Sequence, residues 1–241
     1  AANQTREEGR HVTAFAKFVQ ARWGKPAPVG PALGNLLTEL VLSPFVWKKL
    51  VGMQMLVEGL AMGAFATLYQ HGRDPLLVKL CQLVMTDEAF HHKFGKIWAD
   101  RTIPKLARAE AEKIEDWAWE VFQVLLFNLA SPDQKQWIYR EVGLDPVWVQ
   151  QAFMEALTDN EIRKELQETT NIFRVLIKTL LKAGIITDRT RNNYAAYIDM
   201  AELYAEGDRM IGDDIAEEGI KYLMKLNGGQ TLRTPSSIAA E

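Results

Sequence analysis

Apolar residues recur at helical spacing along most of this chain, and short segments rich in glycine and proline interrupt them. In residues 5–23, for example, Val12, Phe15 and Val19 fall three or four positions apart, as they do on one face of a helix. The connector GKPAPVGPALG at residues 24–34 ends this pattern. No stretch of useful length alternates apolar and polar residues as a half-buried strand does. The pattern therefore predicts an all-α protein.

The same spacing predicts further helices, separated by turn signals such as HGRDP at residues 71–75 and GLDP at 143–146. We expect these helices at residues 36–70 with a bend near Ser43 and Pro44, 75–98 with a boundary near Pro104, 105–129, a start at SPD (131–133), 147–157, 160–183 and 187–226. We interpret residues 1–104 as a helical bundle. Residues 105–228 then form additional helices packed on it, and the small, polar residues 229–241 form a flexible tail.

The segment LVGMQMLVEGLAMGAFATLY at residues 50–69 is long and apolar enough for two interpretations. Its Gly59 and Gly63 form a GxxxG pair, which is common where membrane helices meet but also lets any two helices approach closely. Glu58 near its middle would cost roughly 2.5–3.5 kcal/mol inside a bilayer. The neighbouring helices are amphipathic, so we favour the buried helix of a soluble protein over a membrane span.

Composition narrows the class of protein further. Hydrophobic residues make up 48% of the chain and charged residues 24%, which is ordinary for a soluble globular protein. The net charge of -3 argues against a nucleic-acid partner. Cys81 is the single cysteine, which excludes disulfide scaffolds and cysteine-based zinc sites and is compatible with a reducing compartment. No basic and apolar leader is visible, and we expect a cytoplasmic protein.

Two segments repeat an acidic pair followed by histidine: TREEGRH at residues 5–11 and TDEAFHH at 86–92. Residues three apart lie on one face of a helix, so Glu8 can direct its carboxylate to the same point as the imidazole of His11. The same spacing joins Glu88 to His91. Two such pairs in a chain with four histidines predict metal ligands.

Glu58 adds a third carboxylate to this prediction. It lies in the apolar segment described above, where a buried acid without a partner is costly. Glu58 and Glu88 are each fifteen residues from Arg73 in the HGRDP turn, so an antiparallel hairpin places them at one depth. Together with the two Glu-x-x-His pairs, Glu58 predicts a site of oxygen and nitrogen ligands that suits iron or manganese.

The segments EEGRH and DEAFH resemble the acid-Glu-x-Arg-His motif of the ferritin-like di-iron carboxylate superfamily, with Phe90 in place of Arg in the second. The resemblance covers roughly residues 1–100. It implies that Glu58 and Glu88 coordinate or bridge two irons and act in catalysis, with Glu8 as a further ligand. It also implies that His11 and His91 bind one iron each. Glu7 and Asp87 would then accept the outer N–H of the opposite helix's histidine.

This chain departs from the family pattern at its beginning. The family carries another carboxylate on a helix well before its first Glu-x-x-His motif, whereas seven residues precede Glu8 here. We expect either that a helix upstream of this sequence supplies it or that a later residue does, Glu168 and Glu202 being candidates.

By this resemblance the chain is expected to activate dioxygen with two iron ions, or with manganese and iron. The expected function is an oxygenase of the hydroxylase, N-oxygenase or epoxidase type, with a small organic substrate, an electron-donor protein and a homodimer as its expected partners. Alternatives are a radical-generating or oxidase subunit, an iron-storage or peroxide-detoxifying protein, and a metal-free helical scaffold. The additional C-terminal helices favour the oxygenase, because a substrate pocket needs walls beyond the bundle.

Overall fold

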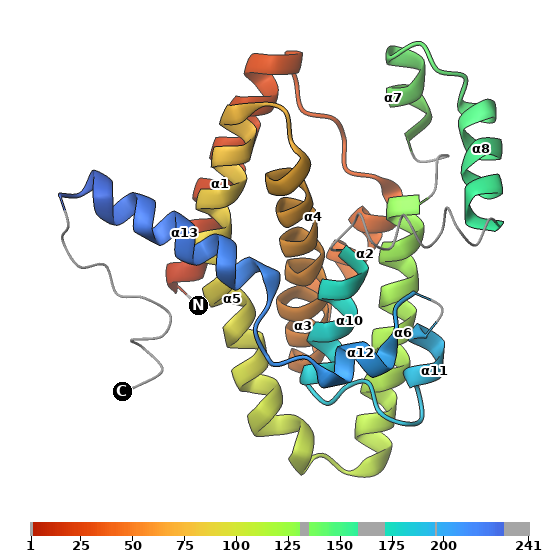
Figure 1. Cartoon of the computed structure of the whole chain (residues 1–241). Coiled ribbons are helices and arrows are strands. Elements are labelled where there is room, and N and C mark those ends of the chain that lie inside the picture. Colours follow the sequence, from red (N-terminus) through yellow and green to blue (C-terminus); the bar gives the residue numbers. More distant parts are fainter. Residues whose placement is uncertain (1, 131–134, 159–171, 196, 229–241) are drawn as a thin grey trace.

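The computed structural model describes residues 2–130, 135–158, 172–195 and 197–228, and within these ranges it contains helices and connecting segments only (Figure 1). The predicted all-α class is therefore confirmed. The helices of the first half are α1 (Ala2–Trp23), α2 (Pro31–Leu42), α3 (Val46–Lys49), the π-helix η1 (Leu50–Val57), α4 (Glu58–His71), α5 (Pro75–Thr102) and the short 3-10 helix η2 (Ile103–Lys105).

The helices of the second half are α6 (Arg108–Ala130), α7 (Gln136–Glu141), α8 (Pro146–Thr158), α10 (Ile172–Lys182), α11 (Arg191–Tyr194), α12 (Met200–Ala205) and α13 (Ile211–Leu226). The predicted helix start at 131–133, the first part of the predicted helix at 160–183 and the predicted tail at 229–241 lie outside the described residues.

The prediction of one long helix at residues 36–70 is wrong in two respects. The first part is a separate helix, α2, which begins at Pro31 and ends before Ser43. Pro44 has no N–H with which to continue the helix, and Ser43 Oγ instead accepts a hydrogen bond from Phe45 N at 3.1 Å. The second part starts as α3 and passes through the π-helix η1 before regular α-helix resumes at Glu58.

The prediction of a single helix at residues 187–226 is also wrong, because the structure divides this segment into α11, α12 and α13. Asp199 caps the start of α12 and accepts hydrogen bonds from Ala201 N and Glu202 N. At the start of α13, Met210 N donates to the side chain of Asp213 at 2.9 Å. Both acidic side chains stabilise a new helix start, which a reading of apolar spacing alone does not detect.

The turn between α4 and α5 sets the geometry that matters most for function. Asp74 caps α5 by accepting from Leu76 N at 2.8 Å, and Pro75 occupies the first helical position, where its missing N–H costs nothing. The chain therefore reverses sharply, and α4 and α5 pack side by side along their length.

Glycines in α4 allow a second close contact, with α10 on another side of α4. A Cβ at Gly63 would lie 2.6 Å from the Cα of Ile172, and one at Gly59 would lie 3.2 Å from Leu176 Cδ2. The close helix approach expected at the GxxxG pair is thus observed within the protein. The helical run Val46–His71 is the one described segment long and apolar enough to cross a membrane, and half of its most apolar stretch is buried by the protein.

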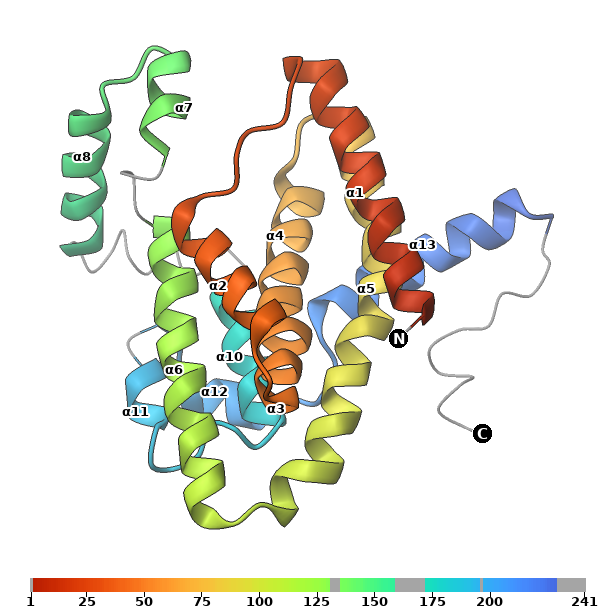
Figure 2. The same ribbon diagram turned by 180° about the vertical axis from the view of Figure 1, so that it is seen from behind.

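The main core joins the helices before and after residue 104. Leu40 and Leu56 from the first part pack in one cluster with Phe122, Leu180 and Tyr194 from the second, and each is fully or almost fully buried. Trp117 and Phe122 of α6 therefore belong to the core. Figures 1 and 2 show α1 and α13 on opposite faces of α5, so the face of α5 that carries the Glu-x-x-His pair is covered by α1.

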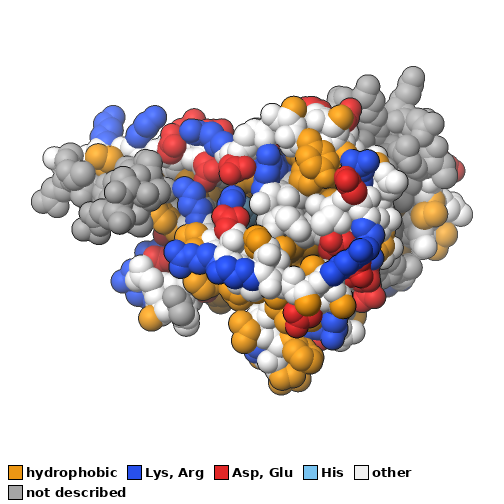
Figure 3. Space-filling view, turned by 90° about the horizontal axis from the view of Figure 1, so that it is seen from below, with side chains coloured by type: hydrophobic (Ala, Val, Ile, Leu, Met, Phe, Trp, Pro, Cys, Tyr) orange, Lys and Arg blue, Asp and Glu red, His pale blue; other side chains and the backbone are white. Residues whose placement is uncertain are grey.

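The surface at the end where α5 and α6 join carries basic and acidic side chains in alternation (Figure 3). Described ion pairs such as Lys96–Asp100 at 2.8 Å and Arg108–Glu112 at 2.7 Å follow the same pattern. Mixed charges of this kind are typical of a solvated surface, and this face shows no basic stripe.

Candidate metal centre

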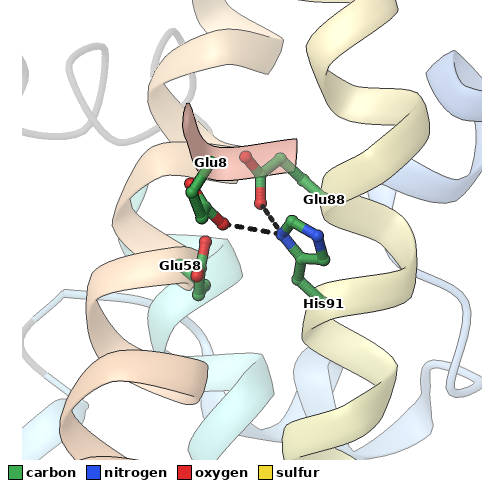
Figure 4. Close-up of side chains that lie close together, drawn as sticks. All are labelled: Glu8, Glu58, Glu88 and His91. Atoms are coloured by element: carbon green, nitrogen blue, oxygen red, sulfur yellow. Dashed lines mark hydrogen bonds and ion pairs between the residues drawn. The ribbon is translucent and has the colours of Figure 1, made fainter. Parts of the chain in front are cut away.

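Three helices bring a group of acidic and histidine side chains together. Glu8 comes from α1, Glu58 from the first residue of α4, and Glu88 and His91 from neighbouring turns of α5. One ligand atom from each of these four residues lies within 4.8 Å of the others (Figure 4). Glu58, Glu88 and His91 are buried. The equal distances of Glu58 and Glu88 from the α4–α5 turn do place both carboxylates at one level.

The fifth predicted ligand, His11 of α1, lies on the other side of Glu88. Glu88 Oε1 is 3.0 Å from His11 Nδ1, and its Oε2 is 2.9 Å from His91 Nδ1. Glu8 is placed similarly, with Oε2 3.6 Å from His11 Nδ1 and Oε1 2.9 Å from His91 Nδ1. Each of these carboxylates thus faces both imidazoles, as a bridging carboxylate does between two metal ions.

Glu58 faces the group from α4 and does not lie between the imidazoles. Its carboxyl group hydrogen-bonds Glu88, and its Oε1 accepts a hydrogen bond from Gln4 Nε2 at 3.3 Å. The resemblance implies that Glu58 and Glu88 coordinate or bridge, and the geometry places Glu8 and Glu88 opposite both imidazoles with Glu58 beside them as a third carboxylate. Gln4 is absent from the sequence-based set, because an amide contact between distant helices leaves no spacing signal.

The outer ring nitrogen of each histidine contacts a carboxylate of the opposite helix. His11 Nε2 is 2.9 Å from Asp87 Oδ2, and His91 Nε2 is 3.0 Å from Glu7 Oε2. These are the contacts expected from the sequence. A proton donated from each Nε2 leaves Nδ1 with its lone pair directed at the cluster, which is the form in which imidazole binds a metal. Arg10 donates to Asp87 at 2.6 Å and holds that carboxylate in place.

The crowded carboxyl groups have strongly shifted pKa values. Burial and the nearby charges of Glu88 and Glu8 raise the pKa of Glu58 to about 9. Burial opposes ionisation of Glu88 as well, but the close contacts of its two oxygens with the imidazoles of His11 and His91 lower the pKa of Glu88 to about 2. At neutral pH one buried carboxyl is therefore protonated beside another that is ionised.

The pKa values of His11 and His91 are raised, whereas burial alone lowers the pKa of an imidazole. Burial favours the neutral ring, but contacts with Asp87 and Glu88 raise the pKa of His11 to about 10. For His91, burial is likewise outweighed by Glu88 and Glu7, which raise its pKa to about 9. The protein by itself therefore holds protons at the positions that a metal ion would occupy, and metal binding must release them.

Two buried atoms of this group have no hydrogen-bond partner, which tests whether a metal fits. His11 Nδ1 and Glu8 Oε1 are inaccessible to water, and although each lies near another member of the cluster, neither makes a hydrogen bond. Unsatisfied buried polar atoms cost about 1–3 kcal/mol each. Metal coordination would satisfy both, and three carboxylates with two imidazoles form a donor set that suits iron or manganese. The residues present fit a metal centre.

The π-helix η1 ends where the site begins. The N–H of Glu58 reaches back five residues to the carbonyl of Met53, which marks the wider turn. Such turns are frequent at functional sites, because they re-aim the residues that follow. Gly95 of α5 packs closely on η1, since a Cβ there would lie 3.1 Å from Gln54 Cβ. The apolar sequence of η1 does not distinguish a π-helix from an α-helix, so the sequence could not reveal it.

The two remaining histidines and Glu202 lie away from the site. His92 is buried, and its Nε2 is 2.8 Å from Thr179 Oγ1, so it points toward α10. His71 is exposed. Glu202 is not a ligand, because it is exposed at the surface and pairs with Arg174 at 3.1 Å. Glu168 lies outside the described residues.

A groove with a volume of about 850 Å³ opens directly onto the carboxylates. Four of the five predicted ligands line it, and His91 does not. The remaining lining is largely apolar and comes from six elements. It consists of Gln4, Thr5, Val12 and Phe15 of α1, Leu40 and Val41 of α2, Lys49 of α3, Leu50, Met53, Gln54 and Val57 of η1, Ala61 and Phe65 of α4, and Phe94 of α5.

Comparison of the chain with protein-family models, with curated proteins and with solved structures finds no match in any of the three. The resemblance to the ferritin-like motif therefore concerns the segments EEGRH and DEAFH. The case for a metal centre rests on the geometry of Glu8, His11, Glu58, Glu88 and His91.

Proposed function

We propose that this protein is a dioxygen-activating oxidoreductase with two iron ions, or one manganese and one iron, that oxidises a small organic substrate. The observation that supports it most directly is the placement of Glu8 and Glu88, each of which faces the inner nitrogens of both His11 and His91. Two imidazoles that share two carboxylates would suit two neighbouring metal ions. The ions, when bound, supply the activation of dioxygen.

The roles of the side chains follow from their contacts. His11 and His91 would each hold one ion through Nδ1, with Asp87 and Glu7 fixing the rings through their outer nitrogens. Glu8 and Glu88, which each face both imidazoles, would help to hold the ions, and Glu58 would add negative charge on the side of α4. The turnover of such a centre requires electrons, and we propose a partner protein as their donor.

The groove favours oxidation of a substrate over iron storage. A storage site needs only a path for ions, whereas this groove is bordered by apolar side chains such as Val12, Met53 and Phe65. Its volume of about 850 Å³ lies in the range of pockets that enclose small organic molecules. Apolar walls also exclude water from the side on which a substrate would meet the centre.

Anaerobic loading with ferrous iron, elemental analysis and oxygen consumption test this function. We expect about two irons per chain and oxygen uptake on exposure to air. Glu88→Ala removes the carboxylate that faces both histidines and should lose most of the iron, whereas Glu120→Ala, at an exposed position of α6, should lose none. A wild-type protein that retains no iron, or a Glu88→Ala variant that retains as much as wild type, would contradict the proposal.

A further inference from the structure

The groove described above is long and follows one face of η1 and α4. Its lining positions there run from Lys49, at the end of α3, through Met53 and Val57 to Phe65. Successive lining positions fall about one helical turn apart, so they lie along one line. At 1.5 Å per residue this line extends on the order of 20 Å. Glu58 lies between its ends, so a molecule in the groove passes the carboxylates rather than ending at them.

The two ends of the groove differ in character. At one end the rings of Phe15 and Phe65 stack 5.2 Å apart and form an apolar wall. At the other end lies Lys49, the one lysine or arginine in the described lining. The apolar walls between them come from opposite sides, for example Val12 of α1 and Met53 of η1.

The charge of Lys49 is available to a ligand. Lys49 Nζ donates to the carbonyl oxygen of Val41 at 2.7 Å, and it makes no ion pair with a carboxylate of the described residues. Its neighbour Lys48 differs, because it pairs with Glu39 at 2.6 Å. An ammonium group with one carbonyl partner retains two donors and a full positive charge for an anion.

We propose that the groove binds an elongated, largely apolar carboxylate, with its anionic end at Lys49 and its apolar body extending past Glu58 toward Phe15 and Phe65. The apolar walls bury the body of the ligand, and the positive charge of Lys49 binds its carboxylate end. The oxidised position then lies within the chain or ring system and not at the carboxylate. This assignment of the reacting position rests on the proposed function, whereas binding of the carboxylate does not.

The test uses isothermal titration calorimetry on the metal-free protein with decanoate and with decan-1-ol, which share an apolar chain and differ in charge. We expect both to bind with one saturable site and to compete with each other. Lys49→Glu should weaken the affinity for decanoate about tenfold, because it removes an attraction and adds a repulsion. It should change the affinity for decan-1-ol by less than about twofold. Lys17→Glu, the same charge change at an exposed position of α1 outside the groove, should change neither.

A second variant tests the path past the carboxylates. Ala61→Trp places a large ring in the groove one turn after Glu58 and should weaken both ligands at least about tenfold, with the thermal unfolding of the variant checked in parallel. Equal effects of Lys49→Glu on both ligands, or no saturable binding by wild type, would overturn the proposal. Iron loading distinguishes the two hypotheses: two irons without carboxylate binding refute this inference alone, and carboxylate binding without iron refutes the proposed function alone.

Discussion

Replacement of Glu58 by glutamine should stabilise the metal-free protein while it damages the metal centre. Glu58 is 7% exposed, and burial together with the charges of Glu88 and Glu8 raises its pKa to about 9. The folded protein therefore keeps a proton on this carboxyl at neutral pH that the unfolded chain releases. Glutamine has nearly the same shape as the protonated acid and nothing to ionise, so it preserves the packing and removes this cost.

The size of the effect follows from proton linkage. The unfolded value is 4.5, so at pH 7 retaining the proton costs up to about 3 kcal/mol, at roughly 1.4 kcal/mol per pH unit. Glu58 shares its proton with Glu88, which reduces the expected gain to about 1–3 kcal/mol. Between pH 4.5 and 9 the wild-type folded state binds more protons than the unfolded state at Glu58. Its stability relative to Glu58→Gln therefore falls as the pH rises.

Urea denaturation of chelator-treated protein at pH 5 and pH 7.5 measures this difference. We expect Glu58→Gln to exceed wild type by less than about 1 kcal/mol at pH 5 and by clearly more at pH 7.5. Glu120→Gln makes the same chemical change at an exposed position of α6 and should change stability at neither pH. A difference for Glu58→Gln that is absent, or independent of pH, would refute the view that Glu58 is an uncompensated buried acid.

Three further predictions follow from other contacts. His91→Ala should lower the iron content from about two to about one per chain by elemental analysis, because His91 faces one of the two metal positions; an unchanged content would remove it from the ligand set. Asp87→Asn weakens the acceptor that orients His11 and should lower metal affinity about 10–100-fold in competition with a chelator, without changing the maximal stoichiometry. Gly63→Ala should destabilise the protein by about 1–3 kcal/mol in thermal unfolding, because the new methyl group meets the backbone of α10. Gly9→Ala has open space around it and should be neutral or stabilising, so equal losses at the two glycines would contradict the close α4–α10 contact.

Much of the candidate metal centre could be predicted from the sequence, because the signals involved are local. The spacing of three between Glu8 and His11, and between Glu88 and His91, places each pair on one helix face whatever the fold. The equal distances of Glu58 and Glu88 from the HGRDP turn fix their common depth once the turn reverses the chain. The same local logic predicts most helix bounds, and it fails where a polar cap such as Asp199 starts a new helix.

Other properties of the site were decided only by the tertiary structure. Which carboxylates face both imidazoles depends on how α1 packs against α5, and the residue spacing did not show that Glu8 is one of them. The π-helix before Glu58 packs closely on Gly95 of α5, and the apolar pattern of η1 does not distinguish it from an α-helix. The groove with Lys49 at one end is lined by side chains of α1, α2, η1 and α4, which are brought together only by the fold. Residue spacing along one helix carries no information about the distances between helices, so these features emerge only when the helices pack.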